Sequence, residues 1–355
     1  MVATLNTTVI QNASSSTANI TLDTAGNVAV SGMPYGSSSF LRNRIINGNM
    51  ATDQRNAGAS QTITAAAALA YTVDRWYAYS TGANVTGQRV QGASANQYRY
   101  QFTGAASVTA IGFAQRIEAI NSADLAGSTA TLSVDISNSL LTTVTWTAYY
   151  ANTTDTFGTL ASPTVTSIAT GSFTVTSTVT RYNAQISIPS AANTGLQIVF
   201  TVGAQTSGAW VIGNVQLEVG TVATPFERPL YSKQLADCQR YAYKSIGSTG
   251  TYCYFPAFGA ADATTTAQFV EMFPVPMRSS SALTLTTTGT AANYSIYVGG
   301  AVRACTVVPT IGAPQGSGDA CQFTATTTAV LTAGQACQLL GTNASSAYLL
   351  WTSEL

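Results

Sequence analysis

The fold is decided by the segment that opens with Asn43-Arg44-Ile45-Ile46-Asn47-Gly48-Asn49-Met50 and closes with Val215-Gln216-Leu217-Glu218-Val219-Gly220. Between these two phrases, apolar and polar residues alternate in several short stretches separated by turn residues. Three of the alternating faces are Ala130, Leu132, Val134 and Ile136; Val144, Trp146, Ala148 and Tyr150; and Leu196, Ile198, Phe200 and Val202. Repeated period-two stretches of this kind predict an antiparallel β-sandwich and not alternating strands and helices.

The parts that flank this segment predict three further units. Residues 1–40 are rich in Thr, Ser and Asn, and two short alternating stretches around Ile20 and Val28 predict a small hairpin. A lone hairpin is marginal in water, so we expect it to dock on a partner. Beyond the two prolines at 225 and 229, helical spacing predicts one helix from about Ser232 to Lys244. Residues 246–355 then return to strand patterning and predict a separate β-domain.

Composition narrows the possible functions. Charged residues make up only 8% of the chain, and 14 basic residues balance 14 acidic ones, so nothing supports nucleic-acid binding. No apolar run is long enough to span a bilayer, and Met1-Val2-Ala3-Thr4-Leu5-Asn6 lacks the features of a signal peptide. We therefore expect no membrane insertion and folding in a cytoplasm.

The chemistry-bearing residues argue against catalysis. The chain contains no His, which excludes Ser-His-Asp and Cys-His mechanisms and removes a common metal ligand. The 14 acidic residues include no recognisable catalytic pair. The five cysteines include no Cys-x-x-Cys pair, so we expect small buried side chains and not a zinc site. These cysteines are Cys238, Cys253, Cys305, Cys321 and Cys337. We expect no enzyme activity and no catalytic residue.

Several further motifs follow the opening phrase in a set order. They are Met50 to Asn56, Tyr71-Thr72-Val73-Asp74-Arg75-Trp76, Gln115-Arg116-Ile117-Glu118, Leu125-Ala126-Gly127 and Ala236-Asp237-Cys238-Gln239-Arg240-Tyr241. Together with the closing phrase, they resemble a family of bacteriophage tail-fibre and related virion proteins with a carbohydrate-binding-module-like jelly roll, over residues 41–245. The end of the chain, from Phe273-Pro274-Val275-Pro276-Met277-Arg278 onward, is similar to the ends of such fibres.

The resemblance implies a virion protein, assembled in the cytoplasm of a host bacterium. It implies a homotrimer that binds host-surface glycan and attaches to other virion proteins through residues 1–40. The expected fold class is then all-β. It comprises an N-terminal hairpin and docking segment (1–40), a jelly-roll β-sandwich (41–229), a short linker helix (230–245) and a C-terminal β-domain (246–355).

The resemblance implies a structural calcium ion, but the residues at the matching positions favour calcium binding less. In carbohydrate-binding jelly rolls, an acidic residue of the opening phrase and one of the last strand help to hold calcium. The matching positions here are Asn49 and Asn214, and amides carry less charge for a hard cation. We expect no cofactor and no metal, with a calcium ion at these two residues as the alternative.

Five residues are the candidate glycan contacts. Tyr77 and Tyr79 lie on one face with Arg75 and offer flat rings and hydroxyl groups, although packing is the alternative role. Tyr252 and Tyr254, together with Phe255 and Phe258, line either a distal receptor surface or a trimer core.

Other polar and aromatic residues favour structural roles. We expect Trp76 and Trp146 in the core. Asp74-Arg75 and Arg116–Glu118 fit paired structural ions better than ligand contacts. Glu218 is expected to face solvent or a calcium ion.

Three functions therefore remain open. The first is a phage fibre protein that displays a glycan-binding region. The second is a head fibre or capsid decoration protein without a glycan role. The third, a polysaccharide-degrading enzyme, has the least support.

Overall fold

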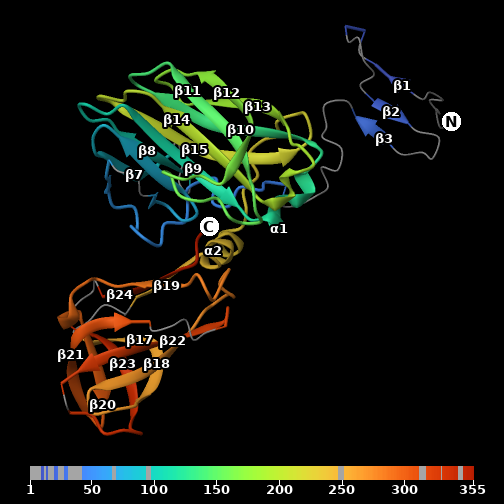
Figure 1. The fold of residues 1–355 in the computed structure, drawn as a ribbon. Helices are drawn as coiled ribbons and strands as arrows, with labels where there is room; N and C mark the ends of the chain where they lie inside the picture. Colours follow the sequence, from blue (N-terminus) through green and yellow to red (C-terminus); the bar gives the residue numbers. More distant parts are fainter. Residues whose placement is uncertain are drawn as a thin grey trace, which may run out of the picture.

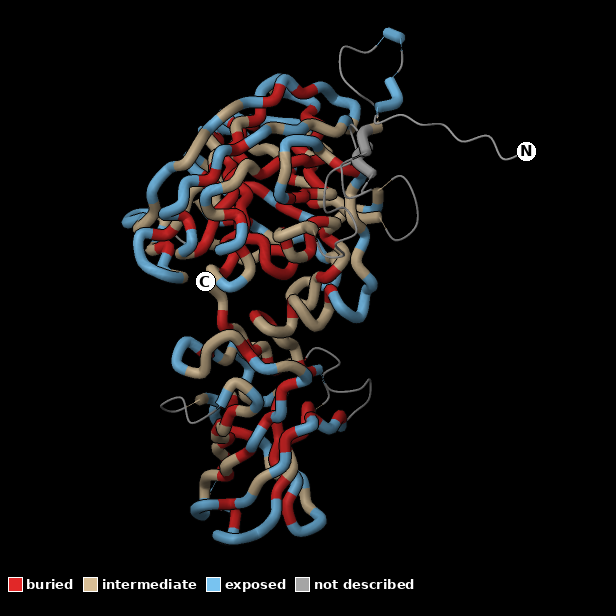
Figure 2. Tube along the Cα trace, turned by 90° about the vertical axis from the view of Figure 1, so that its right-hand side faces the viewer, coloured by how far each residue is buried: buried red, intermediate tan, exposed pale blue. Residues whose placement is uncertain are grey.

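The computed structural model describes residues 9–11, 13–14, 20–22, 28–30, 42–65, 69–92, 97–246, 252–311, 317–328, 330–342 and 347–355. The described chain is all-β with a few short helices, and from residue 42 onward it forms two lobes joined near helix α2, Tyr231–Gln239 (Figure 1). Each lobe has its own buried interior (Figure 2). Alternation of apolar residues therefore predicted the fold class correctly, and the larger lobe is a jelly-roll β-sandwich.

Two six-stranded antiparallel sheets form the sandwich (Figure 1). The first has the order β13 (Thr180–Ser187), β10 (Thr129–Asn138), β15 (Ala209–Val219), β8 (Tyr98–Thr103), β7 (Val85–Gln91) and β4 (Gln61–Ile63). The second has the order β12 (Val165–Thr174), β11 (Thr143–Ala151), β14 (Leu196–Val202), β9 (Ala110–Ile117), β6 (Tyr77–Thr81) and β5 (Ala70–Tyr71). Non-consecutive neighbours within each sheet mean that the chain crosses repeatedly between the two layers.

Aromatic side chains fill the space between the sheets. Trp76 is fully buried and stacks on Phe113, with ring centroids 4.7 Å apart, and Tyr100 stacks on the same ring at 5.2 Å. Trp146 is also buried. The expected core positions of Trp76 and Trp146 are thus confirmed.

The opening and closing phrases lie against each other. Val215 N donates to Gly48 O at 2.9 Å, and Arg44 N donates to Leu217 O at 2.9 Å. Asn43 adds a side-chain clamp, because its Nδ2 donates to Val215 O and its Oδ1 accepts from Leu217 N, both at 3.0 Å. A Cβ atom at position 48 would lie 2.1 Å from Val215 O, so glycine permits this close approach. Residues at the two ends of the segment thereby close the sandwich.

The smaller lobe combines a barrel with a three-stranded sheet. The closed barrel has the order β17 (Tyr252–Ala261), β18 (Thr266–Met272), β22 (Ala320–Thr327), β21 (Ala301–Thr310), β20 (Tyr294–Val298) and β23 (Ala336–Thr342). The sheet has the order β16 (Ala242–Ile246), β24 (Tyr348–Thr352) and β19 (Thr284–Thr286). Trp351 of β24 packs against Phe273 and Phe323, which joins the sheet to the barrel interior.

The linker helix is shorter than its spacing predicts. The helix ends at Gln239, and Lys244 lies in strand β16, which pairs with β24 more than a hundred residues later. Pairing with this distant strand outweighs the local helical pattern, so the expected helical end at Lys244 was wrong.

Other expectations have mixed outcomes. Strands β2 (Ile20–Leu22) and β3 (Val28–Val30) pair antiparallel as the N-terminal hairpin, with β1 (Val9–Ile10) beside β2. The turn between β2 and β3 and the linker at 31–39 lie outside the described residues. All five cysteines are buried, as expected. Within the described ranges, no helix is both long and apolar enough to cross a bilayer.

Candidate functional site

Arg75, a predicted glycan contact, lies in a buried cluster between the two lobes. Its side chain forms an ion pair with Glu354, donates to Arg116 O at 2.6 Å and lies 3.4 Å above the Tyr241 ring. Only 2% of Arg75 is exposed. The predicted glycan contact was therefore wrong, because residues near position 354 cover this end of the sandwich.

The same cluster holds further charges. Arg55 Nη2 donates to Glu354 Oε1 at 2.8 Å, and Arg55 Nη1 lies 3.3 Å from Asp74 Oδ1. Burial raises the pKa of the Asp74 carboxyl to about 6, although the Arg55 charge opposes this shift. The structural role expected for Asp74 and Arg75 is confirmed, although the two do not pair with each other. Asp74 pairs with Arg55, and Arg75 pairs with Glu354.

Arg116 and Glu118 also act structurally. Arg116 donates to Gln197 Oε1, Leu355 O and Gly158 O. Glu118 accepts hydrogen bonds from the guanidinium of Arg240 at 3.2 Å and from the Tyr241 hydroxyl at 2.7 Å. Their contacts tie the sandwich to α2 and to the end of the chain.

Tyr77 and Tyr79 point away from the sandwich core, yet neither is an open platform. Tyr77 is 1% exposed, with the Arg116 guanidinium 5.3 Å above its ring, so its predicted role as a glycan contact was wrong. Tyr79 is half-buried and lies over Gly112, where a Cβ would come within 2.1 Å of the ring. Tyr79 stays a candidate glycan contact.

Glu218 differs from its predicted position. It is 1% exposed, and it accepts hydrogen bonds from Thr224 N at 2.9 Å and Thr224 Oγ1 at 2.7 Å. The segment after Gly220 folds back over β15 and covers the carboxylate. The expected solvent-facing or calcium-facing position was therefore wrong.

The barrel aromatics divide into two groups. Tyr252, Tyr254 and Phe258 are 49%, 53% and 64% exposed on the outer face of β17, whereas Phe255 is buried inside the barrel. The inclusion of Phe255 in a receptor surface was wrong, because alternation along β17 turns it inward. Tyr252 and Tyr254 remain available for either predicted role.

The two calcium candidates have other roles. Asn214 Nδ2 donates to Asp135 Oδ2 at 2.8 Å, and Arg181 Nη1 donates to Asp135 Oδ1 and to Asn214 O. The Arg181 guanidinium thus already occupies two oxygen atoms beside the predicted calcium position. Asn49 instead lines a cavity beside α2. In the described chain, no group of three or more Cys, Asp or Glu side chains forms a metal site.

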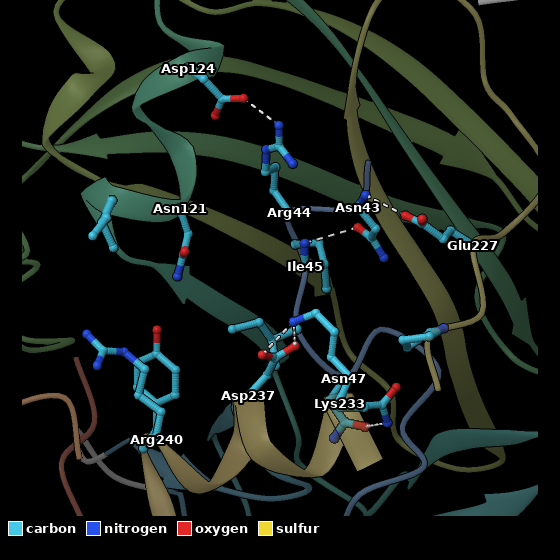
Figure 3. Close-up of a pocket in the computed structure, with 15 residues that line it drawn as sticks. Asn43, Arg44, Ile45, Asn47, Asn121, Asp124, Glu227, Lys233, Asp237 and Arg240 are labelled. Carbon is cyan, nitrogen blue, oxygen red and sulfur yellow. Dashed lines mark hydrogen bonds and ion pairs between the residues drawn. The ribbon is translucent and has the colours of Figure 1, made fainter. Parts of the chain in front are cut away.

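An open cavity of about 590 Å³ lies where the opening phrase, the α1 region and α2 meet (Figure 3). Short helix α1 (Ala119–Ser122) contributes Ile120 and Asn121, and Asp124 follows in the next turn. The remaining wall comes from three segments. These are Asn43 to Asn47, Glu227 with Pro229, and the α2 side chains of Lys233, Gln234 and Asp237 with the adjoining Arg240 and Tyr241.

The charges in this cavity are largely engaged with one another. Arg44 pairs with Asp124 on one wall, and Lys233 Nζ lies 2.8 Å from both carboxylate oxygens of Asp237 on another. Glu227 Oε2 accepts from Asn43 N at 2.9 Å. Asn121 points its amide toward the open centre (Figure 3). The cavity thus presents amide, guanidinium and carboxylate groups in fixed positions, a chemistry suited to hydroxyl-bearing ligands.

No sequence motif predicts this cavity. Asn43 to Asn47 indicate the fold, and Asn121, Lys233 and Gln234 carry no motif of their own. One available signal was the density of amide and charged residues around the opening phrase in a chain that is otherwise poor in charge.

Comparisons with known proteins identify no family. No family model matches, and no curated protein matches. Among solved structures, a CBM4 structure is 15% identical, with 49% of this chain and 98% of that chain covered and a TM-score of 0.31. The enzymatically active domain of tailspike protein 4 from bacteriophage CBA120 is 18% identical, with 50% and 22% covered and a TM-score of 0.33. TmCBM61 in complex with β-1,4-galactotriose is 11% identical, with 50% and 99% covered and a TM-score of 0.33. These likenesses assign no function to this chain.

Proposed function

We propose that this protein is a non-catalytic component of a bacteriophage fibre and that it binds a host-surface glycan in the cavity between the opening phrase and α2. The observation that carries the proposal is the set of planar polar groups around that cavity. Amide and guanidinium groups donate pairs of hydrogen bonds to adjacent sugar hydroxyls, and carboxylates accept them. The exposed Ile120 side chain at the rim offers an apolar contact for a sugar ring.

The carboxyl groups favour binding over hydrolysis. Glycoside hydrolysis requires a protonated acid and a second carboxylate on opposite sides of the scissile bond. In the cavity, Asp124 and Asp237 each have a basic partner. Burial raises the pKa values of Asp74 and Glu271, but neither carboxyl lines the cavity.

The proposal extends to the virion. The ordered set of motifs from Asn43 to Tyr241 supports a fibre protein, and the N-terminal strands β1 to β3 supply a unit that docks to other virion proteins. We further propose a homotrimer in which the apolar outer face of the barrel, with Tyr254, Phe258 and Met272 exposed, contacts other copies.

A binding and turnover experiment tests the function. The full chain is applied to an array of bacterial surface polysaccharides, and the same polysaccharides are assayed for release of reducing ends. We expect retention without release, and Asn121→Ala should weaken retention about 5-fold because one amide contributes about 1 kcal/mol. Asn183→Ala, on the exposed face of β13, is the matched control.

Three results would contradict the proposal. Release of sugar would indicate an enzyme. Equal binding by the Asn121 and Asn183 variants would place the glycan elsewhere. Location on the capsid by electron microscopy, without glycan binding, would favour a decoration protein.

A further inference from the structure

A second cavity, of about 530 Å³, lies next to the first beside α2. Pro229 and Gln234 line both cavities, so the two are neighbours along the linker. The sandwich contributes Asn49 from the opening phrase, Arg89 from β7 and Tyr98 from β8. The linker and helix contribute Arg228 and Tyr231.

The charge of this second cavity differs from that of the first. Arg89 and Arg228 line it, and none of the described residues in its wall is acidic. The nearest acid to Arg89 is Asp53, 3.9 Å from its Nε, and that carboxylate already accepts hydrogen bonds from Asn56 N and Gly58 N. Arg228 is exposed, and no ion pair forms at it within the described residues. The wall therefore presents two guanidinium groups and no carboxylate: Arg89 pairs with Asp53, which lies outside the wall, and Arg228 has no ion-pair partner in the described chain.

The positive groups are held in place to different degrees. Arg89 is anchored, because its Nη1 donates to Ala51 O at 2.6 Å and its guanidinium lies 4.5 Å above the Tyr98 ring. Arg228 is free to adjust to a ligand. Tyr231 begins α2, whose first turn has no capping side chain, and the helix dipole there also favours an anion.

Two tyrosines complete the arrangement. Tyr98 is partly exposed, and Tyr231 is 63% exposed. A tyrosine ring packs against the C–H face of a sugar and its hydroxyl adds a hydrogen bond, so rings beside two arginines match a sugar that bears an acidic group. A simple inorganic anion would use the arginines but leave the rings unused.

We propose that the second cavity binds the acidic group of an anionic saccharide, a uronate or a phosphate-substituted sugar, whose neutral part continues into the first cavity. This inference rests on the proposed function, since it names the class of glycan for the same binding region. Arg89 and Arg228 contact the acidic group, Tyr231 packs on its sugar ring, and Asn49 donates to a neighbouring hydroxyl.

The test is calorimetric titration of the full chain with two acidic probes and their neutral counterparts. The probes are a hexuronic-acid tetrasaccharide with its carboxyl-reduced form, and a phosphorylated oligosaccharide with its dephosphorylated form. We expect at least one acidic form to bind about 10-fold or more tightly than its partner, with affinity that falls as salt rises. The better of the two acidic probes identifies the source of the charge.

Single-residue variants test which side chains bind the acidic saccharide. Arg228→Gln should weaken binding of the acidic probe about 10-fold and leave the neutral probe unchanged, whereas Tyr231→Ala should weaken both. Both side chains are exposed, so neither change disturbs a core. Arg303→Gln in barrel strand β21 removes the same charge away from both cavities and serves as the control.

The failures of the two proposals are distinguishable. Neutral and acidic probes bound equally tightly, or Arg228→Gln indistinguishable from Arg303→Gln, would overturn the anionic site and leave glycan binding intact. Absence of binding to every probe, together with no retention on the polysaccharide array, would overturn both.

Discussion

Replacement of Glu271 by Gln should make the barrel more stable at alkaline pH. Glu271 of β18 is fully buried, and neither carboxylate oxygen has a hydrogen-bond partner among the described residues. It faces Cys321 across the β18–β22 pair, and Ser245 and Tyr243 of β16 lie close to it. Burial raises the pKa of Glu271 from 4.5 to about 7.

The sign and size of the effect follow from proton linkage. Between pH 4.5 and about 7 the folded state keeps a proton that the unfolded state has released, so the free energy of unfolding falls as pH rises. A shift of this size corresponds to a loss of about 3 kcal/mol once the pH exceeds the folded pKa. The amide side chain of the variant cannot ionise. The variant should therefore equal wild type near pH 4 and exceed it by up to about 3 kcal/mol at about pH 8.

Urea unfolding at about pH 4, 6 and 8 measures this difference. Trp351 is the one tryptophan beyond residue 210. A Trp351→Phe variant shows which unfolding phase of the fluorescence signal comes from this residue. The buried carboxyl of Asp74 also titrates in this range, but it is common to both proteins and cancels in the comparison. Asp319→Asn, at an exposed position of the smaller lobe, is the control; it keeps Glu271, so its stability should fall with rising pH as that of wild type does. A Glu271→Gln variant that is less stable than wild type at the highest pH, or a difference that does not vary with pH, would refute the reasoning.

Three further changes test other parts of the structure. Arg75→Gln should lower the free energy of unfolding by about 3 kcal/mol, because it leaves a largely buried Glu354 carboxylate with one fewer partner, and a double-mutant cycle with Glu354→Gln should show non-additivity in urea unfolding. Gly48→Ala should cost about 2 kcal/mol, since its Cβ would lie 2.1 Å from Val215 O; an unchanged melting temperature would contradict this close approach. Phe258→Ser should convert the proposed trimer to a monomer in light scattering without unfolding the barrel, because the side chain is 64% exposed; an unchanged mass would exclude this face as the contact.

The fold was predictable because strand alternation is a local property. Residues such as Leu132 and Val134 reveal which face of a strand points inward, whatever the rest of the chain does. The same pattern correctly predicted that Tyr77 points away from the sandwich core. It could not show that Arg116 and the end of the chain would cover that outer face, since these contacts join residues far apart in the sequence.

The candidate site was harder to predict for a related reason. Asn43, Asn121 and Lys233 meet at one cavity only after the sandwich has closed and α2 has packed beneath it. Glu218 illustrates the opposite case: alternation predicted an outward position, but the returning Thr224 segment covers it. Sequence periodicity specifies the face of the strand on which a side chain lies. Whether that side chain is exposed, and which distant residues it meets, depends on tertiary packing.

The Glu354 clamp has a consequence for the order of folding. Its contacts with Arg55 and Arg75 span 299 and 279 residues. During synthesis, the sandwich strands emerge long before position 354, so the sandwich can form while both arginines still lack this partner. Contacts of such high sequence separation are slow to form. Refolding should therefore show an early phase from the sandwich tryptophans and a later phase in which the lobes lock together, and removal of the Glu354 carboxylate should alter only the later one.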